Sequence, residues 1–278
     1  MAETQRGIYF IEEIGKGAYK IYERRDAAMY LVCGRERACL IDTAFGLCDL
    51  KALTGELTKL PVMVVNTHGH TDHVLGNHWF YGGGTGRVRM HPADRPLYEE
   101  VAASFGGILN DPWVKNTFGE FIRGVDPSAV RFPGTEDILD GDVIDLGGKK
   151  LEVVGMPGHT AGSVMLLDRE EKICYAGDSV VENLWLFLEE SLPPETYLIS
   201  LRRAKGILEK AGIGRIYNGH FSYVPLTPPQ MDGMIAGMET IVRGAAKGEP
   251  FENAVGKGVR YSFGDWSVLC CDDTDLPV

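Results

Sequence analysis

The chain has 278 residues, 44% of them hydrophobic, which is enough to bury a substantial core in one or two domains. It carries 28 Lys and Arg residues against 39 Asp and Glu, and the resulting net charge of −11 repels phosphate backbones, so we do not expect a nucleic-acid ligand. The N-terminus has no basic start followed by an apolar stretch, and no run reaches about 18 apolar residues, which predicts neither a signal peptide nor a membrane span.

Apolar runs in the first quarter of the chain predict two β-hairpins, a helix and a strand. Residues 8–23 form the first hairpin, and residues 28–44 form a second one around the polar segment Gly-Arg-Glu-Arg. Leucines at helical spacing predict a helix in residues 47–57. The continuous apolar run at 62–66 is typical of a strand buried on both faces. This strand leads directly into the densest histidine cluster of the chain.

The segment from about residue 92 to residue 140 predicts two helices, in residues 92–109 and 111–125. Their apolar residues include Leu97, Val101, Phe105, Trp113, Phe118 and Phe121. We expect these helices to form an insertion that overhangs the site as an apolar lid and shapes its pocket, with a dimer surface or an ordinary packed layer as alternatives.

In the second half, three apolar runs predict strands, in residues 150–156, 172–179 and 216–223. Each run leads into, or ends on, a residue that can bind a metal ion. These residues are His159, Asp178 and His220. Since binding sites of open sheets lie at the carboxyl ends of the strands, we expect these side chains to meet.

Two further helices are predicted, in residues 191–212 and 228–248, each with an apolar stripe that faces the core. No internal repeat or flexible linker divides the chain, so we expect residues 1–278 to form a single domain. The six cysteines show no CxxC pair and fall mostly inside apolar runs, which indicates reduced thiols in a cytoplasmic protein.

Residues 67–78 read THGHTDHVLGNH and hold four of the seven histidines. On a helix, His68 and His70 would point about 200° apart, whereas an extended or looped backbone turns both to the same side. The glycine between them favours such a loop. Asp72 and His73 are neighbours whose side chains diverge, so they are placed to hold a different ion. The stretch therefore predicts two metal ions.

Imidazole and carboxylate ligands suit zinc best, with iron or manganese as alternatives. No thiolate lies nearby in the sequence, which argues against a closed structural zinc site. Two ions need more ligands than residues 67–78 offer, and the three residues at the strand ends complete the set. We interpret His78 and His91, which fall outside this pattern, as structural residues.

The motifs THGHTDH, PGHTAGS, GD and GH follow one another in an order that resembles the metallo-β-lactamase superfamily. The resemblance covers about residues 28 to 225 and implies an α/β fold, a four-layer αββα sandwich with the site at one edge between the two sheets. It implies a first metal on His68, His70 and His159, a second on Asp72, His73 and His220, and Asp178 bridging both. It also implies that Asp42 orients one of the ligands.

The expected reaction is hydrolysis of a small-molecule ester, lactone or thioester by a metal-bound hydroxide. Two carboxylates leave a site with two divalent ions positively charged, so a bridging water should lose a proton near neutral pH. We expect Asp72 to orient this hydroxide as well. Tyr223 is a candidate oxyanion donor, with ordinary packing as the alternative. Ser163 lacks the flanking glycines of a nucleophile elbow, so no serine mechanism is needed.

A non-haem iron oxidoreductase of the sulfur dioxygenase type is the alternative function, because the same ligands can bind iron. The physiological substrate is not predicted by the sequence. Among macromolecular partners, we expect neither nucleic acid nor a membrane, and a homodimer is possible.

Overall fold

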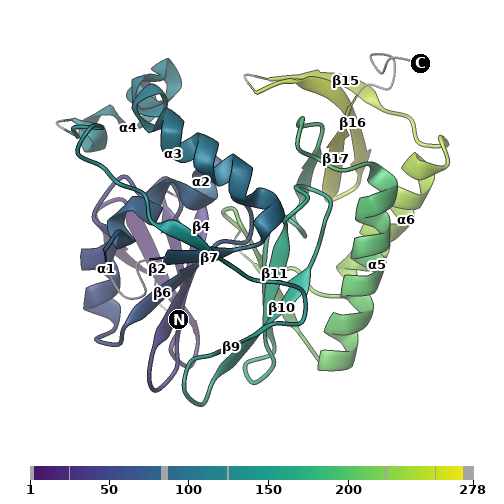
Figure 1. Ribbon diagram of the computed structural model, residues 1–278. Coiled ribbons are helices and arrows are strands. Elements are labelled where there is room, and N and C mark those ends of the chain that lie inside the picture. The colour runs from purple at the N-terminus through teal and green to yellow at the C-terminus, as the bar shows by residue number, and fades with distance from the viewer. Residues whose placement is uncertain are drawn as a thin grey trace.

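The computed structural model describes residues 3–24, 26–82, 87–123, 125–222, 224–253 and 255–271. Two sheets lie face to face, and helices cover the outer side of each (Figure 1). The four-layer αββα sandwich implied by the sequence motifs is therefore confirmed.

The first sheet has eight strands in chain order, β1 to β8. These are β1 (Thr4–Arg6), β2 (Tyr9–Gly15), β3 (Ala18–Glu23), β4 (Ala28–Cys33), β5 (Ala38–Ile41), β6 (Val62–Val65), β7 (Arg87–Met90) and β8 (Gly134–Asp137). Both predicted hairpins are present, as the antiparallel pairs β2–β3 and β4–β5. Strands β5 to β8 run parallel. Strand β6 is less buried than predicted, because Val62 and Met63 are only half-buried.

The second sheet has the order β14-β12-β11-β10-β9. Its strands are β9 (Val143–Asp145), β10 (Lys150–Gly155), β11 (Val164–Asp168), β12 (Ile173–Gly177) and β14 (Arg215–Asn218). Strands β12 and β14 are parallel, and Gly177 pairs with Asn218. The carboxyl ends of these two strands therefore lie side by side at one edge of the sheet.

A smaller sheet has the order β13-β17-β16-β15. Its strands are β13 (Asn183–Leu186), β15 (Glu249–Glu252), β16 (Lys257–Phe263) and β17 (Trp266–Cys270). Strand β13 pairs in parallel with β17, and β17 packs into the same apolar cluster as the second sheet and its helices.

All five predicted helices are present, as α1 (Leu50–Leu57), α3 (Arg95–Asn110), α4 (Pro112–Ile122), α5 (Pro194–Ala211) and α6 (Gln230–Val242). The structure adds three short helices that were not predicted, namely α2 (Thr71–Val74) and the 3₁₀ helices η1 (Leu75–Phe80) and η2 (Pro92–Asp94). The Asp111 side chain caps α4 by accepting from two backbone N–H groups, and Gly212 ends α5 in the left-handed conformation. Within the described residues, no helix has the length and apolar character needed to cross a membrane.

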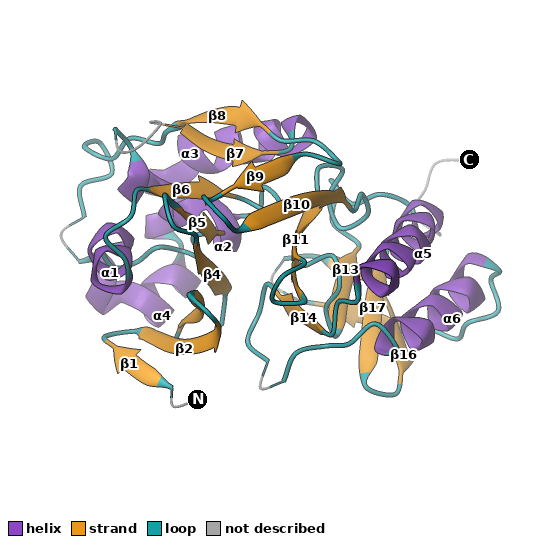
Figure 2. Ribbon diagram, turned by 90° about the horizontal axis from the view of Figure 1, so that it is seen from below, coloured by secondary structure: helices purple, strands orange, loops and turns teal. Residues whose placement is uncertain are grey.

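Three apolar clusters separate the layers. The first lies between the first sheet and helices α1, α3 and α4, and it includes Phe105 and Phe118. The second lies between the second and third sheets and helices α5 and α6. Tyr30 and Tyr175 belong to the third, which fills the space between the two large sheets. Figure 2 shows the two helical layers on opposite sides of the strands.

Candidate metal centre

The HxHxDH segment joins the end of β6 to the short helix α2. His68 and His70 lie in the connecting loop, and His70 is the N-cap residue with extended backbone angles. Asp72 and His73 then fall on α2 itself. The loop predicted for the first two histidines is therefore present, and the change to helix explains why the next pair of side chains points elsewhere.

The remaining candidates come from the second sheet. His159 lies in the loop after β10, Asp178 follows β12 directly, and His220 follows β14 after one glycine. Position 219 has no room for a side chain, because a Cβ atom on Gly219 would lie 2.2 Å from Asp178 Oδ1 and 2.5 Å from His73 Cε1.

The structure brings all seven predicted ligand residues into one cluster. Three groups of them each present ligand atoms within 4.8 Å of one another. The groups are His68, His70 and His159, which we call the first subsite, then Asp72, His73 and His220, which we call the second subsite, and finally His68, His73 and Asp178. Asp178 contacts members of both subsites, with Oδ2 3.7 Å from His159 Nε2 and 3.0 Å from His220 Nε2.

Hydrogen bonds on the far side of two rings determine which nitrogen faces the cluster. The Thr67 hydroxyl donates to Asp42 Oδ2 at 2.7 Å, so its oxygen accepts from His68 Nδ1 at 3.1 Å. His73 Nδ1 donates to the same carboxylate at 2.9 Å. In the neutral form of both rings, Nε2 is therefore the nitrogen that carries the lone pair, and it faces the cluster.

His159 is held in the same way, because its Nδ1 donates to the carbonyl oxygen of Trp185 at 2.7 Å. His70 Nε2 contacts the carboxylate of Glu190 at 2.5 Å, and this hydrogen bond lowers the pKa of Glu190.

The residues present fit a bound cation. His68 Nε2, His73 Nε2 and Asp178 Oδ1 are buried polar atoms that have no hydrogen-bond partner among the described residues. Buried polar atoms are rarely left unpaired, and here all three belong to the group of imidazole and carboxylate donors that meets the ligand preference of zinc, iron and manganese.

The histidine pKa values differ between the two subsites. Burial and the neighbouring His70 lower the pKa of His159 to about 4, and burial together with His73 lowers that of His68 well below its ordinary value. Burial also opposes charge on His73, but Asp72, Asp178 and Asp42 outweigh it and raise the pKa to about 9. The first subsite is therefore suited to neutral imidazole ligands, while the carboxylates favour positive charge in the second.

Asp178 and His220 are in direct contact, with Asp178 Oδ2 3.0 Å from His220 Nε2, and each shifts the pKa of the other. Burial disfavours the charged carboxylate, yet His220 and His73 hold the pKa of Asp178 well below its usual range. Burial also disfavours the charged form of His220, and Asp178 raises its pKa well above the usual value. A carboxylate that stays ionised here keeps two acceptor oxygens available between the subsites.

The other sequence-based candidates lie as follows. Asp42 contacts His73, as expected of a residue that orients a ligand. His78 packs among Trp79, Phe105 and Phe132, and His91 caps η2, so neither joins the cluster. Tyr223 lies outside the described residues.

Sequence reasoning missed Thr67, Asp94 and Glu190. Thr67 precedes the first histidine and could have been suspected from its position. Asp94 contacts Gly69 and Gly162, and Glu190 contacts His70, across 25, 68 and 120 positions of the sequence. Contacts of this range leave no local pattern.

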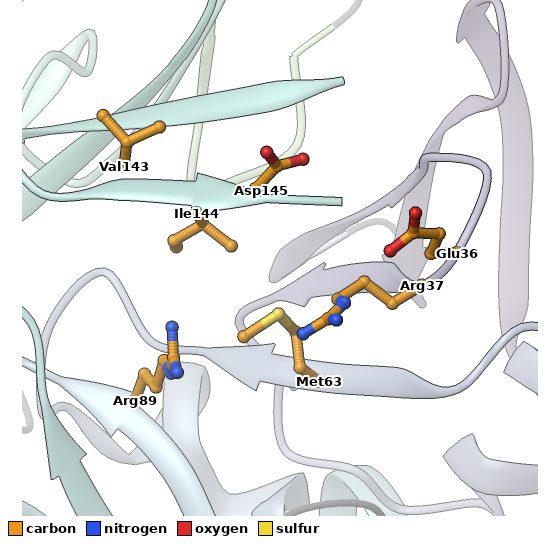
Figure 3. Close-up of a pocket in the computed structure, with 7 residues that line it drawn as sticks. All are labelled: Glu36, Arg37, Met63, Arg89, Val143, Ile144 and Asp145. Carbon is orange, nitrogen blue, oxygen red and sulfur yellow. The ribbon is translucent and has the colours of Figure 1, made fainter. Parts of the chain in front are cut away.

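A cavity of about 360 Å³ lies away from the cluster, between β9 and the first sheet. Figure 3 shows Ile144 of β9 facing Met63 and Arg89 across it, and none of the seven candidate ligands lines it. A second hollow of about 290 Å³ lies by the ends of α3 and α4.

Comparison with known proteins places this chain in a family with the same order of motifs. The family model described as the metallo-beta-lactamase superfamily matches residues 23–220. The acyl-coenzyme A thioesterase MBLAC2 of Homo sapiens is 27% identical over 238 residues, which cover 77% of this chain and 81% of that protein. A hydroxyacylglutathione hydrolase of Mesorhizobium japonicum is 27% identical over 161 residues, which cover 58% and 48% of the two chains.

Solved structures show the same fold. A metallo-beta-lactamase from Pontibacter korlensis superposes with a TM-score of 0.61 at 17% identity, covering 83% of this chain and 99% of that one. A metallo-beta-lactamase family protein from Thermus thermophilus gives a TM-score of 0.57 at 21% identity, covering 82% and 81%. These similarities concern the fold alone.

Proposed function

Because the chain belongs to the metallo-β-lactamase superfamily, we propose that it is a dinuclear metal-dependent hydrolase of small esters, lactones or thioesters. The observation that carries this proposal is the convergence of seven imidazole and carboxylate side chains. Three of their buried atoms that can bind a metal ion have no hydrogen-bond partner among the described residues. Within this class we favour thioesters, since MBLAC2 relatives named as acyl-coenzyme A thioesterases align over more than three quarters of the chain.

In this proposal the residues of the first subsite would hold one ion and those of the second subsite the other, and Asp178, which lies close to members of both, would be available to either. Zinc fits the ligand set best, with iron or manganese as alternatives. Bound ions of this kind lower the pKa of water and polarise a carbonyl group. The protein itself contributes rings whose ligating nitrogens are already selected by Asp42, Thr67 and the Trp185 carbonyl.

In this proposal Asp72 is the side chain that accepts a hydrogen bond from the attacking water. Its Oδ2 atom lies 3.6 Å from His73 Nε2 and 3.7 Å from His220 Nε2, and the side chain is 27% exposed, compared with 12% for Asp178. Asp72 Oδ2 can therefore accept a hydrogen bond from the attacking water and orient its lone pair toward the substrate carbonyl.

Two measurements on the untagged protein test the proposal. Elemental analysis after purification without added metal should give close to two zinc ions per chain. Release of free thiol from short acyl thioesters should fall by about 10²-fold or more in the His73→Ala variant, because that ring belongs to the second subsite. His91→Asn is the matched control, since asparagine can still cap η2 and the activity should persist.

Full thioester hydrolysis by His73→Ala would contradict the mechanism. Iron in place of zinc, with oxygen consumption in the presence of persulfides, would instead support the sulfur dioxygenase type of reaction.

A further inference from the structure

We propose that Glu190 is a positioning residue that fixes the orientation of His70, and that residues 185–192 together select the ligating nitrogens of two of the three first-subsite histidines. This inference rests on the metal centre proposed above. Neither the sequence motifs nor the family match assigns a role to this segment, because it lies between the Asp178 and His220 motifs.

The first step concerns the ring of His70. Glu190 Oε1 lies 2.5 Å from His70 Nε2, and a carboxylate can only accept a hydrogen bond. Nε2 must therefore carry the proton, so in the neutral ring Nδ1 holds the lone pair. A charged acceptor makes this hydrogen bond stronger than one to a neutral group.

The second step concerns the ring of His159, on the other side of the first subsite. Its Nδ1 donates to the Trp185 carbonyl oxygen at 2.7 Å, which leaves the lone pair on Nε2. His159 Nε2 and His70 Nδ1 lie 2.9 Å apart. Two lone pairs at this distance repel each other unless a proton or a cation lies between them. The segment thus leaves two lone-pair nitrogens, His159 Nε2 and His70 Nδ1, next to each other in the first subsite.

The third step explains how the segment is held. The Ser191 hydroxyl donates to the His159 carbonyl oxygen at 2.9 Å, and Leu192 N donates to the Gly158 carbonyl oxygen at 2.8 Å. Trp185 belongs to β13, which pairs with Leu269 of β17. The ends of the segment are therefore fixed to the histidine loop and to the small sheet, and Glu190 sits between these two anchors. The small sheet thereby acquires a role in metal binding.

Zinc affinity provides the first test. Competition with a chromophoric chelator should show that Glu190→Ala binds its first zinc ion 10 to 100-fold more weakly than wild type. Glu190→Gln should recover most of this loss, because the amide oxygen can still accept from Nε2. Glu189→Ala is the matched control, because Glu189 is the neighbouring residue and its side chain is exposed, so the zinc affinity should not change.

Histidine NMR provides the second test and needs neither metal nor activity. In the metal-free wild-type protein, at a pH where the ring is neutral, long-range ¹⁵N–¹H spectra should show His70 protonated on Nε2. In Glu190→Ala the two tautomers should mix, while the His159 signals keep the Nδ1 proton.

A His70 ring protonated on Nδ1 in wild type, or zinc affinity of Glu190→Ala equal to that of Glu189→Ala, would overturn the role of Glu190. Failure of the wild-type protein to bind any metal would refute the proposed function, while the tautomer spectra would still decide whether Glu190 orients the ring.

Discussion

Asp94 connects the two loops that carry the first-subsite histidines. It is 1% exposed, and its oxygens accept from Gly69 N at 2.9 Å, Gly162 N at 2.6 Å and the Thr160 hydroxyl at 2.6 Å. We expect Asp94→Ala to lower the free energy of unfolding by about 2 to 4 kcal/mol, because buried donors lose their acceptor. Urea denaturation of the metal-free protein measures this loss without a contribution from bound ions.

A graded control separates the connection from general damage. Thr160→Val removes one of these hydrogen bonds and leaves both backbone donors paired with Asp94, so the loss should be about 1 kcal/mol. Equal losses for Asp94→Ala and Thr160→Val would contradict the idea that Asp94 joins the loops.

Glu23 is a buried carboxyl group outside the metal centre. It is 1% exposed and accepts from Phe45 N at 3.0 Å, Leu47 N at 2.9 Å and the Tyr9 hydroxyl at 3.3 Å. Burial outweighs these hydrogen bonds and raises its pKa from 4.5 to about 7. Between these two values the folded chain holds a proton that the unfolded chain releases, so the stability contributed by this group is present below the lower value and is lost as pH rises through the higher one.

Glu23→Gln removes this titration. Between pH 4.5 and 7 the wild-type protein should lose about 3 kcal/mol of unfolding free energy that the variant keeps. The difference, variant minus wild type, should therefore rise by about 3 kcal/mol across this range and be flat on either side. Denaturation at a series of pH values measures the difference, in which all other titrating groups cancel. Parallel curves for the two proteins would show that Glu23 has an ordinary pKa in the folded chain.

At the residue scale, sequence could identify the side chains that carry a chemical signature. His68, His70 and His73 are close together in sequence, and their motif has a fixed order with the later ligands. The residues that orient them have no such signature. Thr67 and Glu190 are ordinary residue types that become meaningful only when the fold brings a specific oxygen to a specific ring nitrogen.

At the element scale, the ends of β12 and β14 show how strand pairing builds the site. Gly219 N donates to the Gly177 carbonyl oxygen at 2.8 Å, which places Asp178 beside His220. We expect Gly219→Ala to reduce zinc binding at the second subsite and thioesterase activity by about 10²-fold, because the added methyl group would collide with Asp178 and His73. Metal titration and thiol release measure both effects.

Gly214→Ala is the matched control, since this glycine precedes the same strand and a Cβ there meets nothing within 4 Å. Its metal content and activity should equal those of wild type. If Gly219→Ala also retained both, the contact between the two strand ends would not set the geometry of the site.

The burial of α3 and α4 is relevant to the prediction that these helices form a lid over the site. Phe118 of α4 is 1% exposed and belongs to the same apolar cluster as the first sheet, with its ring 5.3 Å from that of Phe45. We expect Phe118→Ala to lower the free energy of unfolding of the whole chain by about 3 kcal/mol or more. Trp113→Ala, at a side chain 51% exposed, should cost clearly less.

Chemical denaturation followed by circular dichroism measures both variants. A lid that opened independently of the sheet would leave the main transition unchanged in Phe118→Ala. Because Phe105 of α3 and Phe118 of α4 are buried in the cluster of the first sheet, we interpret both helices mainly as a packed outer layer. The start of α3 lies near the histidine loop, where Leu97 and Asp94 approach Gly69.

Sequence patterns predicted elements whose signals are local. Hairpins and amphipathic helices depend on residues within a few positions of one another, and the two predicted hairpins and five predicted helices are confirmed. The hairpin of β16 and β17 is absent from the sequence-based expectations, although Gly264 and Asp265 separate an alternating segment, 257–263, from the apolar segment 266–270. In the structure Gly264 has φ +67°. The parallel pairing of β13 with β17 joins segments more than 80 residues apart, and periodicity carries no information on such pairs.

At the scale of the whole molecule, the proposed metal centre lies where the two halves meet. His68, His70, Asp72 and His73 come from the segment after β6 of the first sheet, whereas His159, Asp178 and His220 come from the second sheet. The family motif order implied this layering, because it fixes which strand ends face each other. It did not imply the third sheet, whose β13 reaches the site through the Trp185 carbonyl.

This arrangement predicts that bound metal stabilises the entire fold. Only the folded chain presents ligands from both sheets together, so ions bind the native state in preference to the unfolded one. Free zinc at 100 times its dissociation constant should raise the free energy of unfolding by about 2.7 kcal/mol per site, and a chelator should abolish the gain. Thermal unfolding of the same sample before and after chelation measures the shift. The double variant His68→Ala, His73→Ala should show no shift, because it lacks a ligand of each subsite. An unchanged midpoint in wild-type protein shown to contain two ions would mean that the two halves are held together without help from the metal centre.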